Sequence, residues 1–525
     1  MVIKILMLLI FFAITIFIGF YFRKRADNVN SFVLGNRQVG AWLTAFAYGT
    51  AYFSAVIFVG FAGQFGWRFG TAATWIGLGN AFIGCLMPWF ILGRRTRIMT
   101  NHLKSATMPD FFGARYSSNA LKIGASVIIF IFLIPYTASL YNGLSRLFAM
   151  AFNVPFEYCI IAMGILTAIY VVAGGYIGSV VNNFIQGLIM LIGIVLVIAI
   201  VLKNNGGFMA AIEGMARVGE GDPNVIPGVF TSFFGPRPLD LLGVVILTSL
   251  GAWGLPQMIG RFYSIKNENM ITKGAIISTI FAIFIAGGSY FLGSFGRLYE
   301  TKLIQNGAIA SGASGAVAFD AIIPTILSGM SDVMIGLIIV LVFAASISTL
   351  ASLVMASAST LTLDFLKGNI IKTMSERKQL LTIRVLIVVF IAISSAIAII
   401  QVNSRITFIA QLMGISWGAL AGSFLAPFLY GLYWKKVSKI SVWCCFIFSS
   451  LLMTLNVLST NFFPEFFPAI LRSPINAGAF AMLAGLIIVP VVSALTKAPE
   501  KSLVESCFSC YEELVSVKAK EALSE

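Results

Sequence analysis

The sequence is poor in charged residues and contains a single histidine, His102. Only 10% of its 525 residues are Asp, Glu, Lys or Arg, whereas soluble domains carry about 25%, and this excludes a soluble globular fold. The chain has no Walker-type phosphate loop, no cluster of metal ligands and no nucleophile beside a histidine, which argues against an enzyme or an ATP-driven pump. Its six cysteines are scattered and predict no disulfide framework.

Long apolar runs are what the sequence has instead. Mean hydropathy is +0.95 and 59% of the residues are hydrophobic. Because a helix of roughly 20 apolar residues crosses a bilayer, the sequence predicts an all-α integral membrane protein. We expect thirteen spans, at about 2–22, 41–65, 71–93, 121–149, 156–173, 179–202, 238–259, 272–296, 332–362, 383–401, 407–433, 440–459 and 475–495. The first is interpreted as a retained helix, since a basic cluster follows a run too long for a signal peptide.

The net charge of +15 predicts the orientation of the chain rather than binding to nucleic acid. With the N-terminus outside, 25 of the 35 Lys and Arg residues lie in segments predicted to be cytoplasmic, as the positive-inside rule requires. We therefore expect a multi-pass protein of the cell (inner) membrane with a cytoplasmic C-terminus. Surface helices are predicted at 208–218 and 316–327, within two long outer segments. The tail at 497–525 is expected to be loosely ordered.

Two spans have glycine or proline near their middle. The second span reads Ala-Tyr-Gly-Thr-Ala-Tyr-Phe-Ser around Gly49, and the seventh reads Leu-Gly-Ala-Trp-Gly-Leu-Pro-Gln around 251–256. Interrupted helices five crossings apart are typical of transporters built from inverted repeats, here spans 2–6 and 7–11. The alternative is that glycine only allows helices to pack closely in lipid.

The ninth span places oxygen-bearing residues on one helical face. Ala345, Ser348 and Thr349 are spaced at i, i+3 and i+4, and hydroxyl and carbonyl oxygens suit a hard cation such as sodium. This local pattern leaves open a second interpretation, in which the hydroxyls bond only to their own helix. The central parts of the second, seventh and ninth spans lack ionisable residues, which argues against a proton-coupled carrier.

Several motifs resemble the sodium/solute symporter family over roughly residues 5–495. They are Ser-Phe-Val-Leu-Gly-Asn-Arg-Gln-Val-Gly at 31–40, Ala-Thr-Met-Pro-Asp-Phe-Phe-Gly-Ala-Arg-Tyr at 106–116, Tyr-Val-Val-Ala-Gly-Gly-Tyr-Ile-Gly-Ser at 170–179 and Pro-Gln-Met-Ile-Gly-Arg-Phe at 256–262. The resemblance implies a five-plus-five, leucine-transporter-like core at 41–433, with repeats 41–202 and 238–433. An extra helix would lie in 1–40 and two more in 434–496, before the tail at 497–525.

The resemblance also implies a sodium site and makes one departure visible. Carried over residue by residue, the ligands would be Thr50, Phe53, Ala345, Ser348 and Thr349. Some members hold a second sodium with an aspartate in the fifth core helix. Here that position is Asn183, and one companion hydroxyl position is Ala351, although Ser352 remains. We therefore expect one sodium ion per transport cycle.

The expected solute is small and carries a carboxylate. Its pocket is predicted between the two interruptions, at Ser54, Tyr136, Gly251 and Trp253, although the aromatic residues could equally serve packing. The resemblance favours the pantothenate, proline and monocarboxylate branches. Sodium is the coupling ion, and no other cofactor, nucleic acid or obligatory protein partner is predicted. The alternatives are a membrane sensor or receptor with a transporter-like core and a proton-coupled carrier. A metal or redox role for the Cys507–Cys510 pair is not favoured.

Overall fold

The computed structural model describes residues 2–152, 154–220, 225–309, 317–403, 409–463 and 465–522. In these ranges the chain is built from helices, and no β-sheet forms. The first repeat region and the segments around it contain α1 Val2–Tyr21, α2 Val29–Leu34, α3 Ala41–Tyr52, α4 Ala62–Phe69, α5 Thr74–Gly79, α6 Arg94–His102, α7 Met108–Arg115, α8 Asn119–Phe152, α9 Phe156–Asn204 and α10 Phe208–Ala216. The remainder contains α11 Pro238–Gly251, α12 Pro256–Ser264, α13 Met270–Ala282, α14 Gly288–Ser294, α15 Glu300–Gln305, α16 Ile322–Leu327, α17 Asp332–Thr360, α18 Glu376–Asn403, α19 Ile409–Tyr433, α20 Lys439–Phe462, α21 Pro474–Leu495 and α22 Lys501–Ala522.

Eleven helical stretches in the described part are long and apolar enough to cross a membrane. Two of them, Val56–His102 and Glu157–Asn204, have 47 and 48 residues, which is about 70 Å of helix and twice the thickness of a bilayer core. Each contains a glycine with positive φ, Gly70 at 61° and Gly175 at 54°, where the chain departs from helical geometry. The count of thirteen crossings, which needs a reversal at each glycine, stays a prediction.

Both predicted interruptions are present in the structure. The first follows α3, where Phe53 adopts an extended backbone conformation (φ −101°, ψ 107°) before helical structure resumes at Val56. The second follows α11, where Leu255 is extended (φ −81°, ψ 123°) and Pro256 begins α12. Proline at the first position of a helix is favourable because its missing N–H would have no partner there. Each interruption leaves free backbone groups inside the protein.

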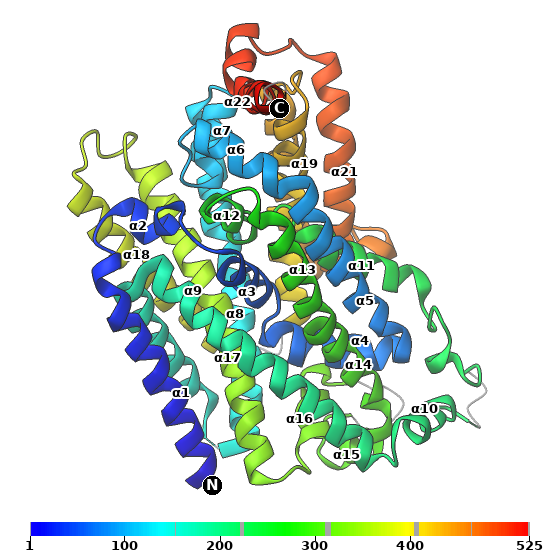
Figure 1. Ribbon diagram of the computed structural model, residues 1–525. Helices are drawn as coiled ribbons and strands as arrows, with labels where there is room; N and C mark the ends of the chain where they lie inside the picture. The colour runs from blue at the N-terminus through cyan, green and yellow to red at the C-terminus, as the bar shows by residue number, and fades with distance from the viewer. Residues whose placement is uncertain are drawn as a thin grey trace.

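Helix α17 is the centre of the molecule. It is buried along nearly its whole length and packs against α9, α8, α1 and α3. Helices α20 and α21 pack on α19, and α1 lies against α9 at the opposite edge (Figure 1). Gly19 allows this last contact, since a Cβ there would lie 2.9 Å from the Cβ of Tyr170. The two termini lie at opposite ends of the molecule (Figure 1).

The C-terminal tail was predicted to be loosely ordered, and this prediction is wrong for most of it. Residues 501–522 form α22, which packs against α6 and α7. Its apolar residues Val504, Cys507 and Phe508 are buried at i, i+3 and i+4, so one amphipathic face docks onto the protein. The hydroxyl of Tyr511 also donates to the carbonyl of Arg95 at 3.2 Å.

The two predicted surface helices are close to those observed. Helix α10 replaces the predicted 208–218, and residues 316–327 contain a short 3₁₀ turn followed by α16. Residue 316, residues 407–408 of the predicted eleventh span, and 523–525 of the tail lie outside the described residues.

Candidate functional site

Four oxygen atoms meet where α3 ends against the middle of α17. The hydroxyl of Ser348 lies 3.2 Å from the carbonyl oxygen of Thr50 and 3.1 Å from that of Ala345. The hydroxyl of Thr349 lies 3.0 Å and 3.1 Å from the same two carbonyl oxygens. All four residues are at most 1% exposed. The structure therefore brings together four of the five residues predicted to bind sodium.

The interruption of α3 explains why the Thr50 carbonyl is available. The last carbonyls of a helix have no partner within that helix, and α3 ends at Tyr52 with the Phe53 N–H bonded to Gly49 at 3.0 Å. The Thr50 side chain is engaged elsewhere, since its hydroxyl donates to Phe46 at 2.8 Å. The C-terminal end of a helix also carries partial negative charge, so α3 directs a field that favours a cation toward this group of oxygens.

The spacing of the four oxygens suits an ion the size of sodium. A cation that holds oxygens at about 2.3–2.5 Å, the range for Ca²⁺, which has a similar radius, sets neighbouring oxygens about 3.3–3.5 Å apart in an octahedral shell. The observed separations of 3.0–3.2 Å are slightly shorter. A small outward movement of the two hydroxyls would therefore open the group enough to hold the ion.

Phe53, the fifth predicted ligand, lies beside this group. Among the described residues no hydrogen bond joins its carbonyl to the other four. Phe53 does line one small cavity together with Ser54 and Ala345. Its backbone lies at the break itself, so its carbonyl is free of helical bonding.

The position of the family's second sodium looks different. Asn183 is fully buried, and neither of its amide atoms has a hydrogen-bond partner in the described part of the chain. The hydroxyl of Ser352 donates to the Ser348 carbonyl at 3.0 Å and accepts a hydrogen bond from the guanidinium of Arg261. The Ser352 hydroxyl, which is kept from the second sodium site of the family, is therefore already bonded to an arginine.

The predicted solute-site residues gather only in part. Tyr136 and Gly251 both contact Trp417 of α19: the Tyr136 ring lies 5.9 Å from it, nearly perpendicular, and a Cβ on Gly251 would lie 2.5 Å from its Cε3 atom. Ser54 lines the small cavity beside Phe53 and Ala345. Trp253 instead donates its indole N–H to the Ile83 carbonyl at 2.8 Å, on the helical segment Asn80–Leu86.

Trp417 was missed by the sequence analysis, although it links the two interruptions. It stacks on Tyr52, with ring centroids 5.8 Å apart, and the Tyr52 hydroxyl donates to the Thr248 carbonyl of α11. One more aromatic residue among 46 Phe, 15 Tyr and 8 Trp gives no signal by itself. Tryptophan usually lies at the membrane–water interface, whereas Trp417 lies near the middle of the predicted span 407–433. This unusual position was the available clue.

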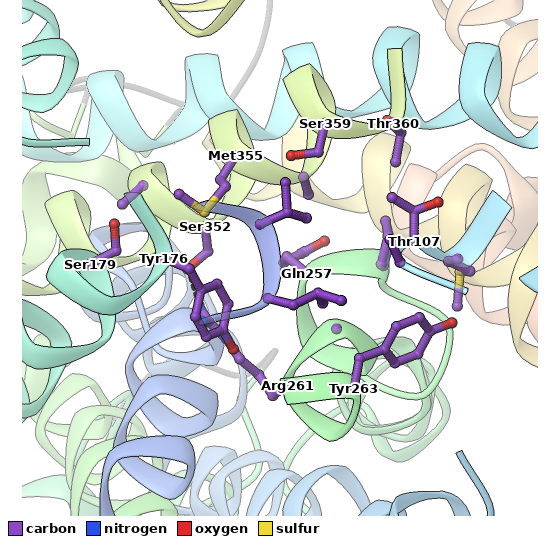
Figure 2. Close-up of a pocket in the computed structure, with 18 residues that line it drawn as sticks. Thr107, Tyr176, Ser179, Gln257, Arg261, Tyr263, Ser352, Met355, Ser359 and Thr360 are labelled. Carbon is purple, nitrogen blue, oxygen red and sulfur yellow. Dashed lines mark hydrogen bonds between the residues drawn. The ribbon is translucent and has the colours of Figure 1, made fainter. Parts of the chain in front are cut away.

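Arg261, which the sequence analysis did not single out, lines a cavity between α12, α17 and α9 (Figure 2). Its side chain is 4% exposed and its guanidinium lies 5.3 Å from the centre of the Tyr176 ring. It begins the segment 261–275, which the charge pattern predicts to be cytoplasmic. Burial instead makes it part of the protein interior, beside the break before Pro256.

Comparisons with known proteins decide the family. A family model described as the sodium:solute symporter family matches residues 32–447. The chain belongs to this family. Sodium-coupled symport across a membrane is therefore its activity, and its relatives are transporters rather than enzymes. The resemblance inferred from the motifs and the choice of sodium as coupling ion are confirmed.

Individual relatives agree with this assignment. The sodium/proline symporters of Staphylococcus aureus strains JH9 and JH1 are each 30% identical over 457 residues, covering 83% of this chain and 82% of theirs. A solved structure of a Na⁺-coupled sialic acid symporter, substrate-bound and outward-open, has a TM-score of 0.72 at 17% identity, covering 95% of this chain and 99% of that one. MHP1, a nucleobase-cation-symport-1 family transporter, has a TM-score of 0.50 at 13% identity over 90% and 97%. The predicted leucine-transporter-like fold class is confirmed.

Proposed function

We propose that this symporter imports a small carboxylate-bearing solute together with one sodium ion. The ion would bind to the carbonyls of Thr50, Phe53 and Ala345 and the hydroxyls of Ser348 and Thr349. The observation that carries this proposal is the approach of the free Thr50 carbonyl to both hydroxyls of α17, at 3.2 Å and 3.0 Å. Alternating access would then open this group to one side of the membrane at a time.

The proposed solute lies beside the sodium, around Ser54, Tyr136 and Gly251, with Trp417 closing the site and Trp253 at its edge. Proline is the first candidate because the 30% identical relatives are sodium/proline symporters. Pantothenate and monocarboxylates follow. The fixed charge of Arg261 on Ser352 and the neutral side chain at Asn183 both support a single sodium ion, since neither offsets a second buried cation.

The orientation is proposed with the N-terminus outside and the C-terminus in the cytoplasm, from the distribution of Lys and Arg. The proposed units are 1–40, the core at 41–433 with repeats 41–202 and 238–433, the extra helices at 434–496, and the tail at 497–525. In this orientation the Arg261 cavity and α22 lie at the cytoplasmic end.

The energetics distinguish the solutes. One sodium ion moving down a tenfold gradient releases about 1.4 kcal/mol, and one net positive charge crossing 100 mV releases about 2.3 kcal/mol. A zwitterion such as proline would use both contributions and could be accumulated several hundredfold. A monocarboxylate anion with one sodium ion carries no net charge, so its accumulation would be about tenfold and insensitive to voltage.

The test is uptake by purified protein in proteoliposomes, with proline, pantothenate, lactate, pyruvate and glucose offered separately. We expect a carboxylate to be taken up only with an inward sodium gradient, and its accumulation to scale with the first power of that gradient. Uptake driven by a proton gradient and indifferent to sodium would contradict the proposal. A second-power dependence would contradict the single ion, and selective uptake of glucose would contradict the solute class.

A further inference from the structure

The cavity beside α12 has an unusual electrostatic character. Eighteen residues line it, and Arg261 is the one that carries a charge. The cavity contains about 620 Å³ of space that no atom fills, part of it open to solvent. Figure 2 shows Gln257, Arg261 and Ser352 around this space, contributed by α12 and α17. A buried site with one cation and several neutral polar groups is suited to an anion.

Arg261 has no counter-ion in the part of the chain that the structure describes. Among the described residues no carboxylate lies within 4.0 Å of its guanidinium, and its Nε has no hydrogen-bond partner. Asp364, which accepts a hydrogen bond from the cavity-lining Thr107 at 2.5 Å, is already paired with Lys122 at 3.3 Å. Buried charges are normally paired, because an unpaired one loses its hydration without compensation. The missing partner of Arg261 is therefore expected to be an external anion.

Gln257 adds a second donor to the same site. It stands four residues before Arg261 on α12, so the two side chains share one helical face. Gln257 is 5% exposed, and both its amide oxygen and its amide nitrogen are without partners in the described part of the chain. An amide and a guanidinium side by side supply directional N–H donors that match the two oxygens of a carboxylate better than they match a spherical ion.

The position of the cavity connects it with the transport path. Pro256, which begins α12 at the second interruption, lines it, and so does Ser352, which bonds to Ser348 one turn away on α17. The cavity thus adjoins both the break and the proposed sodium ligands. We propose that Arg261 and Gln257 form a second carboxylate subsite, which holds the carboxylate of the solute between the central site and the cytoplasm. This inference rests on the proposed solute class.

The test measures charge inside the cavity without measuring transport. Ala356 lines the cavity and is partly exposed, so the Ala356→Cys variant in nanodiscs offers a thiol there. Two methanethiosulfonate reagents of similar size, one bearing a sulfonate and one a quaternary ammonium, report the local potential. Against background labelling of the parent chain, we expect the sulfonate-to-ammonium rate ratio to fall on the order of tenfold when Arg261→Gln is added, since one unit charge is removed nearby.

Protection experiments then identify the ligand. Propionate is expected to slow labelling of the Ala356→Cys variant, whereas propionamide and chloride are not. Gln257→Leu should keep the rate ratio and lose most of the protection, and Arg261→Lys should keep the ratio. If Arg261→Gln fails to fold, the loss of propionate protection in Gln257→Leu still decides the result, and full protection in that variant would contradict the subsite.

Three results would overturn the subsite. They are a rate ratio that changes less than twofold in Arg261→Gln, equal protection by propionamide, and equal protection by chloride. Because labelling needs neither sodium nor uptake, this outcome is independent of the proteoliposome panel. A failure of sodium-coupled uptake and a failure of the subsite are thus distinguishable.

Discussion

Removing one hydroxyl from α17 is the sharpest perturbation of the proposed sodium site. Thr349→Ser keeps the oxygen and Thr349→Ala removes it, so the pair isolates the oxygen from the loss of the methyl group. In the structure the Thr349 hydroxyl lies 3.0 Å from the Thr50 carbonyl and 3.1 Å from that of Ala345. If it is one of five sodium ligands, its loss should cost about 1.5–3 kcal/mol, as for a hydrogen bond to a charged group.

That cost corresponds to a roughly 10- to 150-fold increase in the sodium Kd. A ligand that binds only the folded protein stabilises it by RT ln(1 + [L]/Kd), about 2.7 kcal/mol when sodium is at 100 times its Kd. A Kd that is about 30-fold weaker would leave roughly 0.9 kcal/mol of that stabilisation. Thermal unfolding of purified protein in sodium and in choline buffers measures the difference directly, and sodium-dependent uptake measures it again.

Two control variants test whether the effect belongs to the site. Ser346→Ala removes a hydroxyl from the same helix, but that hydroxyl donates to the Val342 carbonyl at 2.8 Å, away from the site. Thr50→Val removes a side-chain hydroxyl bonded to Phe46 and leaves the Thr50 carbonyl in place. Both should keep the sodium Kd within about threefold, which is under 1 kcal/mol. Wild-type sodium affinity in Thr349→Ala and Ser348→Ala alike would refute the site.

Three further predictions concern stability and reactivity. Lys122→Met leaves Asp364, 1% exposed, without its ion-pair partner and also removes the pair with Asp110 at 2.7 Å, so thermal unfolding should show a loss of about 3–5 kcal/mol. Part of this loss should be recovered when Asp364→Asn is added; additive losses would contradict the pairing. Gly66→Ala places a Cβ 2.1 Å from the backbone of α14 and should cost about 1–3 kcal/mol, whereas Gly287→Ala meets nothing within 4 Å and should unfold like the parent. Burial raises the pKa of the Cys507 thiol, so the reactive thiolate is scarcer at pH 7 than in an exposed cysteine. Maleimide should therefore label Cys507 slowly until the protein unfolds. Rapid labelling of the native protein would show that α22 does not stay docked.

The parts of the site that sequence could predict depend on local rules. Glycine and proline in the middle of apolar runs mark breaks, and the structure places breaks at 53 and 255. The helical period places Ser348 and Thr349 on the face of Ala345, which the structure shows by their shared acceptor carbonyls. The same period is present in the tail, where Val504, Cys507 and Phe508 form the buried face of α22, although the tail was expected to be loosely ordered.

The burial of Arg261 could not be predicted from local sequence rules. It follows a predicted span by two residues, where a cation is expected to face the cytoplasm. Its burial arises because the break at Leu255 redirects the chain, so that α12 packs against α17 and α3. Whether a cation near a span end meets water or protein is a tertiary property. The same holds for Trp417, whose importance comes from the three elements that meet it rather than from its neighbours in sequence.

The departure from the family pattern at Asn183 and the burial of Arg261 bear on the same energetic question. A second sodium ion would have to bind near Ser352, whose hydroxyl already accepts a hydrogen bond from Arg261. Two unit positive charges about 5 Å apart repel by roughly 3 kcal/mol at an effective dielectric constant of 20. An aspartate would offset that repulsion, but Asn183 carries no charge. We infer that Arg261 acts as a permanently bound cation in this region. Unlike a sodium ion it cannot leave with the solute, so it adds nothing to the driving force of transport. On the proposed one-sodium cycle, the charge of Arg261 would be available to receive the carboxylate that the sodium ion accompanies.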